Sequence, residues 1–432
     1  MSWSITMFSQ NGLSLDQAPP ISVVFRFFFS GALFGILAGI LILFFQTAVF
    51  DAHSKEAVTL THTLTLGVML SFMFAALFQM LPVIAGVTLT SPVKKANLLQ
   101  YPFILGTISL LFAFNHSVPW LFGAAALLLG GSILFITLVM LKNLIKLPNH
   151  SSSSKGMLAA LISLGIVILL ALYMTGTLGG VLDGVYYTQV KAAHYSLGLF
   201  GWITLLIISI SFQVIEMFYV TPAYPKLVSK YLPLTLLLLL VTTTAIGLFT
   251  PEIWYISNIL LALLLTGYAL LTLKRLTQRK RPLTDATVWF WRLGLGSLLV
   301  SMLSMVLTLF MDDMFIKTLS YIFFSSFALS IVFAMFYKII PFLTWFHLNS
   351  QGYFTAPMMH EVIHPKTAMK HLYIHLATIA AFVLSVFIPA FIFIAAVLTV
   401  VSFGWMTYQI IHAHLLYKKT QETGEKFEMN IA

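Results

Sequence analysis

Long apolar runs separated by short polar breaks dominate the pattern along the chain. A membrane-spanning helix needs about 20 mostly apolar residues, and twelve stretches meet this condition. We therefore predict an all-α, polytopic membrane protein with about twelve transmembrane helices. The predicted spans are 21–49, 57–88, 98–115, 119–141, 157–180, 191–219, 232–249, 254–273, 286–310, 314–346, 371–389 and 391–415. They form one expected domain over 21–416, between a polar segment at 1–20 and a polar tail at 417–432.

Composition makes the lipid bilayer the expected partner. Apolar residues make up 59% of the chain and charged residues only 8%, far too few charges to cover a soluble protein of this size. The absence of cysteine excludes disulfides, thiolate metal sites and iron–sulfur clusters. The net charge of +10 does not indicate nucleic-acid binding, because the basic residues form short clusters beside apolar spans.

The basic residues predict the orientation. With the N-terminus inside, the cytoplasmic loops and tail hold 18 Lys and Arg, whereas the opposite side holds Lys55, Lys191 and Lys317. Cytoplasmic loops of membrane proteins carry such an excess. Both termini are therefore predicted on the cytoplasmic side. The first twenty residues lack a basic start, so no cleaved signal peptide is expected.

Three of the longest spans share a weak internal repeat and lie four helices apart. The second contains His62 and ends Phe78-Gln79-Met80-Leu81-Pro82, the sixth contains His194 and ends Phe212-Gln213-Val214-Ile215-Glu216, and the tenth ends Phe336-Tyr337-Lys338-Ile339-Ile340-Pro341. Repeats of this kind indicate internal symmetry in membrane folds. The pattern predicts three units of four helices.

The stretches FRFFFSGALFGILAGI (25–40), THTLTLGVMLSFMFAALFQMLPVIAG (61–86) and AAHYSLGLFGWITLLIISISFQV (192–214) resemble helices 1, 2 and 6 of the haem–copper oxidase catalytic subunit. They are most similar to its small stand-alone relatives, the NnrS-type proteins linked to nitric-oxide stress. The resemblance implies three four-helix arcs in a bacterial inner membrane. It also places His62 where the oxidases hold an axial ligand of the low-spin haem.

The oxidase ligand set is incomplete here. His194 lies near the outer start of its helix, the span 232–249 contains no His, and the tenth span offers Ser325, Ser326 and Ala328 where ligands would be needed. A dinuclear oxygen-reducing centre needs those nitrogen ligands, so we do not expect an oxidase. The resemblance implies a protein that keeps one b-type haem or a copper ion near His62 and His194.

The function that the resemblance implies is handling or sensing of a small diatomic gas, nitric oxide or oxygen, or maintenance of a respiratory complex, with respiratory-chain subunits as partners. Whether the chain is an enzyme is left open. A cofactor-free secondary transporter with twelve helices is the alternative, and an assembly protein is a third.

Polar side chains inside lipid are costly, which makes each one a candidate for function. For His62 and His194 the alternative to a cofactor is a hydrogen bond to a neighbouring helix. Gly67 and Gly198 would let a flat macrocycle approach, or serve plain helix packing.

A second group of His gathers on the predicted cytoplasmic side. His371 and His375 are four residues apart and share a helix face as a metal pair would. The alternative is an interfacial belt of amphipathic residues. His360 and His364 complete the zinc-protease pattern HExxH, but Pro365 follows at once and disfavours helical geometry at His364.

Four charges lie within or at the ends of spans: Arg26, Glu216, Arg292 and Lys338. Glu216 and Lys338 occupy nearly equivalent places and could pair, or Lys338 could extend toward the headgroups. Arg292 lies three residues after Trp289, so a cation–π contact explains its place in the span. A contact with a haem propionate is the alternative.

Overall fold

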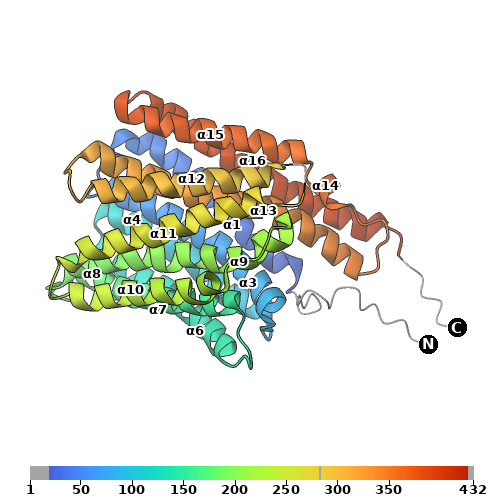
Figure 1. The fold of residues 1–432 in the computed structure, drawn as a ribbon, viewed down its shortest axis with the longest axis horizontal. Helices are drawn as coiled ribbons and strands as arrows, with labels where there is room; N and C mark the ends of the chain where they lie inside the picture. Colours follow the sequence, from blue (N-terminus) through green and yellow to red (C-terminus); the bar gives the residue numbers. More distant parts are fainter. Residues whose placement is uncertain (1–18, 282–283, 427–432) are drawn as a thin grey trace. The chain divides into compact units, whose positions relative to one another are not determined.

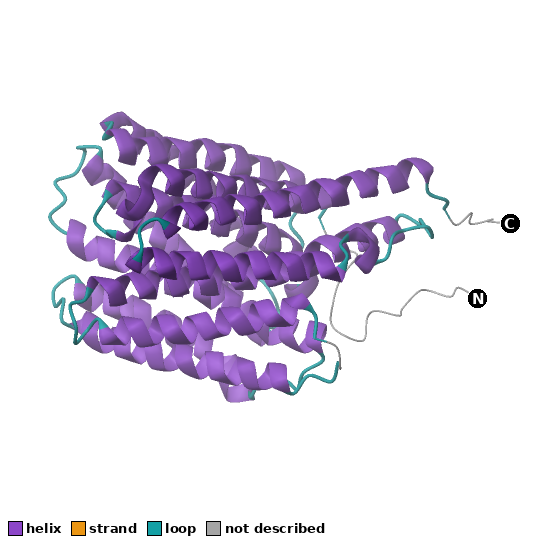
Figure 2. Ribbon diagram, turned by 90° about the horizontal axis from the view of Figure 1, so that it is seen from above, coloured by secondary structure: helices purple, strands orange, loops and turns teal. Residues whose placement is uncertain are grey.

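A computed structural model describes residues 19–281 and 284–426. Within these ranges, twelve helices are long and apolar enough to cross a membrane, and each coincides with a predicted span. The twelve-span prediction is thus confirmed. Figure 2 shows helices throughout the described chain and no strand, as a lipid environment requires of a backbone that satisfies its own hydrogen bonds.

Most spans are single helices, and three contain a π-helix. The elements are α1 (Ile21–Phe45), η3 (Gln46–Phe50), α2 (Lys55–His62), η4 (Thr63–Leu70), α3 (Ser71–Ala85), α4 (Pro92–His116), α5 (Pro119–Ala125), η5 (Ala126–Gly130), α6 (Gly131–Ile145), α7 (Ser152–Leu178), α8 (Tyr187–Ser196), η6 (Leu197–Thr204), α9 (Leu205–Tyr219), α10 (Lys226–Gly247), α11 (Ile253–Thr277), α12 (Ala286–Leu307), α13 (Met314–Ser350), α14 (Met359–Val362), α15 (Pro365–Phe387) and α16 (Phe391–Thr423).

The described chain divides into two compact units, and the single transmembrane domain over 21–416 stays a prediction. Unit 1 contains Met73–Lys280 and Met305–Phe310 together with the start of α1. Unit 2 contains Phe25–Phe72, Arg281–Ser304 and the chain from Met311 onward. A uniform run of apolar spans carries no composition change at these boundaries, which explains why the sequence did not show the division.

In unit 1, α7 packs along α9 and α10, and α10 packs against α11 (Figure 1). Small residues bring these helices close together. A Cβ added at Gly156 of α7 would lie 2.5 Å from the Cβ of Ser209 in α9. Small residues at such contacts let helix backbones approach, which is a main source of helix association in lipid.

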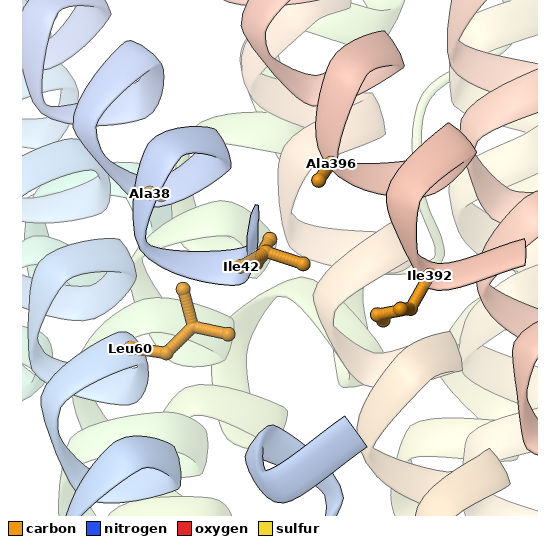
Figure 3. Close-up of a cluster of buried hydrophobic side chains, with 5 residues drawn as sticks. All are labelled: Ala38, Ile42, Leu60, Ile392 and Ala396. Atoms are coloured by element: carbon orange, nitrogen blue, oxygen red, sulfur yellow. The ribbon is translucent and has the colours of Figure 1, made fainter. Parts of the chain in front are cut away.

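In unit 2, α1 packs against α16 through another small-residue surface. Ala38 and Ile42 of α1 meet Ile392 and Ala396 of α16, with Leu60 of α2 beside them (Figure 3). Added Cβ atoms at Gly35 and Gly39 would lie 2.1 Å from the Phe403 ring and 2.6 Å from Val400. These glycines therefore leave room for side chains of α16.

Polar and rigid residues mark the helix starts. The Ser54 hydroxyl accepts from the Ala57 N–H at α2, and the Asp313 carboxylate accepts from the Phe315 and Ile316 N–H groups at α13. Side chains of this kind satisfy first-turn N–H groups that have no helical partner. Pro119 begins α5 and Pro365 begins α15, positions at which a missing N–H costs nothing.

The bounds of the first two four-helix segments repeat along the chain. Leu197, where η6 starts, lies 134 positions after Thr63, where η4 starts (197 − 63). The same shift relates the first residues of α3 and α9, of α4 and α10, and of α5 and α11. The last four-helix segment departs from the repeat, because α13 is a continuous 37-residue α-helix.

The shared register also shows how the two predicted ligands are placed in the repeat. Aligned on the π-helices, His62 corresponds to Ser196, and His194 corresponds to Leu60. The two histidines are therefore two residues out of register: His62 directly precedes η4, and His194 lies three residues before η6. Because π-helices are rare and concentrate at functional sites, their recurrence here is itself a functional indication.

The first part of the predicted polar tail is helical. Helix α16 continues to Thr423, and its end is tied to the turn after α13 by Gln351 and Gln421, which both hydrogen-bond the Tyr417 hydroxyl. Lys, Gln and Glu are good helix formers, so the helix continues where hydropathy falls.

Gly35→Ala should destabilise the protein by about 1–3 kcal/mol, the usual effect of forcing an extra carbon into a packed interior. The added methyl group would overlap the Phe403 ring. Thermal unfolding of the detergent-solubilised protein measures the change. Gly296→Ala on α12 is the matched control, since a Cβ there meets no atom within 4 Å. Equal melting temperatures for the two variants would contradict this account of the contact.

Candidate functional site

Unit 2 holds a buried imidazole with hydrogen bonds at both ring nitrogens. His371 of α15 is fully buried. Its Nδ1 lies 2.9 Å from the Tyr337 hydroxyl of α13, and its Nε2 lies 2.7 Å from the Ser402 hydroxyl of α16. A neutral imidazole has one donor and one acceptor nitrogen. His371 therefore donates to one hydroxyl and accepts from the other, and joins three helices.

His375 lies one turn further along α15 and is also buried. Its Nε2 lies 2.9 Å from the hydroxyl of Ser330 on α13. The prediction that His371 and His375 share a helix face is correct. The interpretation of the pair as part of an interfacial belt is wrong, because both rings lie inside the protein.

Aromatic rings enclose the two imidazoles. The Phe333 ring centroid lies 4.7 Å from that of His371 and 5.0 Å from that of His375. Phe290 of α12 contacts both imidazoles and stacks on Tyr337. These rings surround the polar atoms with apolar groups, which strengthens each hydrogen bond and raises the cost of losing one.

An ion pair lies beside this network, one residue further along α13. The Lys338 ammonium lies 2.6 Å from a carboxylate oxygen of Asp285, just before α12. Asp285 also accepts hydrogen bonds from the Thr287 hydroxyl and the Val288 N–H. Burial alone would raise the pKa of Asp285, but the Lys338 charge and these hydrogen bonds outweigh it and hold that pKa below its ordinary value.

Serine hydroxyls continue the polar contacts between α12 and α13 away from the ion pair. The Ser297 and Ser326 hydroxyls lie 2.8 Å apart. Further along, the Ser301 hydroxyl donates to the Ser320 carbonyl at 3.0 Å, and the Ser320 hydroxyl donates to the Ser301 carbonyl at 3.3 Å. Hydroxyl contacts of this kind join helices in lipid.

The predicted metal role of His371 and His375 stays a prediction. Among the described residues, no group of three or more His, Cys, Asp and Glu side chains is placed to hold a metal ion. Hydroxyl groups occupy both nitrogens of His371 and one of His375. A metal ion at this pair would have to displace those hydrogen bonds.

His62 and His194 share one local feature. His62 Nδ1 lies 2.8 Å from the Val58 carbonyl oxygen, and His194 Nδ1 lies 3.3 Å from the Val167 carbonyl oxygen. A carbonyl oxygen only accepts, so Nδ1 carries the proton in both rings and the lone pair lies on Nε2. Metal-ligating histidines commonly donate their other N–H to such an oxygen, which fixes the ligating nitrogen.

Gly67 and Gly198, the glycines near the two candidate ligands, have different surroundings. A Cβ at Gly67 would lie 2.5 Å from the Phe34 ring, so this glycine serves helix packing, not approach of a macrocycle. A Cβ at Gly198 would meet no atom within 4 Å.

The remaining predicted charges have specific contacts. The Arg292 guanidinium lies over the Trp289 ring at 4.8 Å, which confirms the cation–π interpretation, and the Arg26 guanidinium lies 5.9 Å from the Phe27 ring centroid. Glu216 accepts from the Tyr224 N–H at 2.9 Å. Pairing of Glu216 with Lys338, and a propionate contact for Arg292, stay predictions.

Unit 1 also contains a buried hydroxyl network near Glu216. The Tyr224 hydroxyl donates to Thr272, and the Tyr268 hydroxyl donates to Ser211. Burial raises the pKa of Tyr224 to about 12. This phenol therefore stays protonated at neutral pH.

The HExxH motif lacks protease geometry, as the sequence indicated. Helix α14 ends at Val362, and His364 has extended backbone dihedrals as the N-cap of α15. His360, Glu361 and His364 are exposed, and the Glu361 carboxylate accepts from the Met358 N–H. The two imidazoles do not share one helix, as a zinc site of this type requires.

Sequence reasoning missed Asp285, Tyr337, Ser330 and Ser402 as parts of the site. Tyr337 and Ser330 lie seven residues apart on α13, and such spacing returns to the same helix face. This seven-residue spacing is the sequence feature from which Tyr337 and Ser330 could have been predicted as parts of the site. The pairing with α15 and α16 is long-range and left no mark in the sequence.

Comparison with models of known protein families and with curated protein sequences finds no match for this chain.

Ser402→Ala should lower stability by about 0.5–1.5 kcal/mol, the scale of hydrogen bonds between membrane helices. The change leaves one nitrogen of buried His371 without its hydroxyl partner. Chemical denaturation in detergent measures the effect, with Ser350→Ala, at an exposed position on α13, as control. A neutral Ser402 variant would show that this hydrogen bond does not hold α15 to α16.

Acid should remove stability contributed by Asp285. Because the folded protein lowers the pKa of this carboxyl, the contribution is present above the unfolded pKa of about 3.9 and is lost as pH falls through the lower folded value. Melting temperatures below pH 4 should therefore fall less steeply for Asp285→Asn than for the unaltered protein. Asp183→Asn, at an exposed position before α8, is the control and should leave the pH slope nearly unchanged.

Proposed function

We propose that this chain is a stand-alone relative of the haem–copper oxidase catalytic subunit, similar to NnrS-type proteins, in a bacterial inner membrane. Its helices would form three four-helix arcs, with both termini in the cytoplasm. It would bind haem b or copper through imidazole ligands. Its role would be handling or sensing of nitric oxide or oxygen, or maintenance of a respiratory complex.

The fixed tautomer of His62 and His194 is the main observation that supports this proposal. Backbone carbonyl oxygens hold the proton of His62 and of His194 on Nδ1. If haem or copper binds, Nε2 would be the ligating nitrogen, as in haem proteins with histidine ligands. A histidine serving only as a surface anchor needs no fixed tautomer.

The π-helices supply independent support. Each candidate ligand is followed within three residues by a π-helix, η4 after His62 and η6 after His194. A π-turn displaces the side chains that precede it relative to those that follow, and such insertions commonly adapt a helix to a ligand.

A cofactor, if bound, supplies the redox or gas-binding chemistry, and the protein supplies ligation and a dry environment. Helix α13 offers Ser325 and Ser326 where an oxidase would place haem ligands. The proposed activity is therefore binding or sensing, not oxygen reduction.

A cofactor-free secondary transporter is the second candidate. Secondary transporters often repeat a structural segment along the chain, and η4 and η6 occupy corresponding positions of two such segments. The twelve spans fit this candidate equally well.

An absorbance spectrum separates the two candidates. We expect a Soret band that shifts on reduction with dithionite, or copper by elemental analysis, in the purified protein. His62→Ala and His194→Ala, tested separately, should each lower cofactor occupancy about tenfold or more, the scale on which disturbed ligation acts. His53→Ala, an exposed histidine before α2, is the control. A colourless, copper-free protein would exclude cofactor binding and favour the transporter.

A further inference from the structure

Basic residues are concentrated at one end of unit 1. The segment 73–280 contains twelve Lys and Arg but only three Asp and Glu. Successive spans cross the membrane in opposite directions, so the starts of α4, α7 and α10 share one end of the unit with the ends of α6 and α11. Eleven of the twelve basic residues lie at or beside these helix ends, and only Lys191 lies at the other. We define the cationic end as the eight exposed lysines within 94–280.

Membrane orientation explains the lysines of the cationic end but not the scarcity of acidic residues among them. Lys and Arg set the orientation of a membrane protein, whereas Asp and Glu contribute little. The segments that form unit 2 contain eleven Lys and Arg and nine Asp and Glu, and ion pairs such as Lys338–Asp285 form there.

At the cationic end the one carboxylate is Glu216, which already accepts a backbone hydrogen bond. Among the described residues, none of the eight lysines forms an ion pair. Their charge is therefore available to an anion from outside the chain.

Helix α10 places one of these lysines beside an exposed apolar face. Four side chains spaced four, three and four residues apart form this face, since such spacing returns to one side of a helix: Leu227, Tyr231, Leu234 and Leu238. Lys230 lies about 60° around the helix from Leu227, at 100° per residue, and its ammonium lies 4.8 Å from the Tyr231 ring centroid. An acyl chain on the apolar face would therefore bring its headgroup to Lys230.

Lys155 brings a charge from a second helix to the same place. Helix α7 packs against α10, and the Lys155 charge lies near enough to Tyr231 to interact with it. The predicted apolar spans begin at residues 157 and 232, so Lys155 and Lys230 each lie two residues, about 3 Å, outside the hydrocarbon core. The headgroup layer extends about 5–8 Å beyond that core. Both lysines therefore lie at the depth of lipid phosphates.

We propose that an anionic phospholipid binds at the cationic end of unit 1, with its phosphate between Lys155 of α7 and Lys226 and Lys230 of α10, and an acyl chain along the exposed face of α10. Lysine binds phosphate as a point charge, and clusters of basic residues beside membrane helices attract anionic lipid.

The two parts of this surface select this class of lipid. A soluble anion would contact the lysines but gain nothing from the apolar face. A zwitterionic lipid would use the apolar face, but its own cationic group would offset the attraction of its phosphate to the lysines. This lipid binding requires neither haem nor copper, because none of the three lysines is a candidate cofactor ligand.

Titration of the detergent-solubilised full-length protein with phosphatidylglycerol tests the proposal. The melting temperature is followed against lipid concentration, since a ligand that binds the folded state shifts unfolding. Phosphatidylcholine with the same acyl chains is the comparison lipid, because it keeps the phosphate and adds a positive charge. Phosphatidylglycerol should stabilise the protein at concentrations about tenfold lower or less, since each basic residue near an anionic membrane contributes roughly fivefold.

Lys155→Gln, Lys226→Gln and Lys230→Gln, combined in one variant, should weaken the response to phosphatidylglycerol about tenfold or more. Exchanging the same three residues for Arg keeps the charge and the binding of phosphate. That second variant should respond as the unaltered protein does, which separates lost lipid binding from a damaged fold.

A matched control removes the same charge elsewhere. It combines Lys366→Gln, Lys370→Gln and Lys418→Gln, three exposed lysines of unit 2 on the same predicted side of the membrane, and should respond to phosphatidylglycerol as the unaltered protein does. Equal losses in the two Gln variants would overturn the proposal, because net charge alone would then attract the lipid. Equal responses to the two lipids, or equal stabilisation by inorganic phosphate, would overturn it as well.

Discussion

The exclusion of unpaired polar groups from hydrocarbon is the constraint on which this structure depends. A backbone in lipid must satisfy its own hydrogen bonds, and so the described spans are helices. Side chains obey the same rule. Hydroxyls within the spans mostly return to carbonyl oxygens one turn earlier, as Thr63 does to Thr59, or pair with another helix, as Ser297 does with Ser326. A polar group that does neither is informative. Gln79, near the end of α3, is buried, and among the described residues neither of its amide atoms has a hydrogen-bond partner.

Two kinds of contact hold the helices together: close packing of small residues and hydrogen bonds between polar side chains. Glycine and alanine bring α1 against α16 and α7 against α9, and since lipid provides little apolar driving force between helices, this contact area matters. Hydrogen bonds then fix the register. His371 contacts α13 and α16 at once, so sliding either helix by one residue would break a buried bond. Close packing therefore stabilises the association of the helices, and the hydrogen bonds of the His371 imidazole fix their alignment.

The sequence predicted the spans well because each depends on local composition. All twelve occur, and Pro389 does separate α15 from α16. Features that depend on distant residues were harder. The Arg292–Trp289 contact was predictable because it is local, whereas the Asp285 partner of Lys338 lies 53 positions away. The π-helices were also missed, because an extra residue in a helical turn leaves apolar composition unchanged.

Two helices of unit 2 are longer than a bilayer requires. At 1.5 Å per residue, the 37 residues of α13 extend about 55 Å and the 33 residues of α16 about 50 Å. Their ends therefore stand in water, where Gln351, Tyr417 and Gln421 bind them together. The same α16 carries Ser402, which is buried inside the protein against His371. Because α16 is one continuous helix from Phe391 to Thr423, it joins the buried contact between Ser402 and His371 directly to the contact between Tyr417 and Gln351 near its other end.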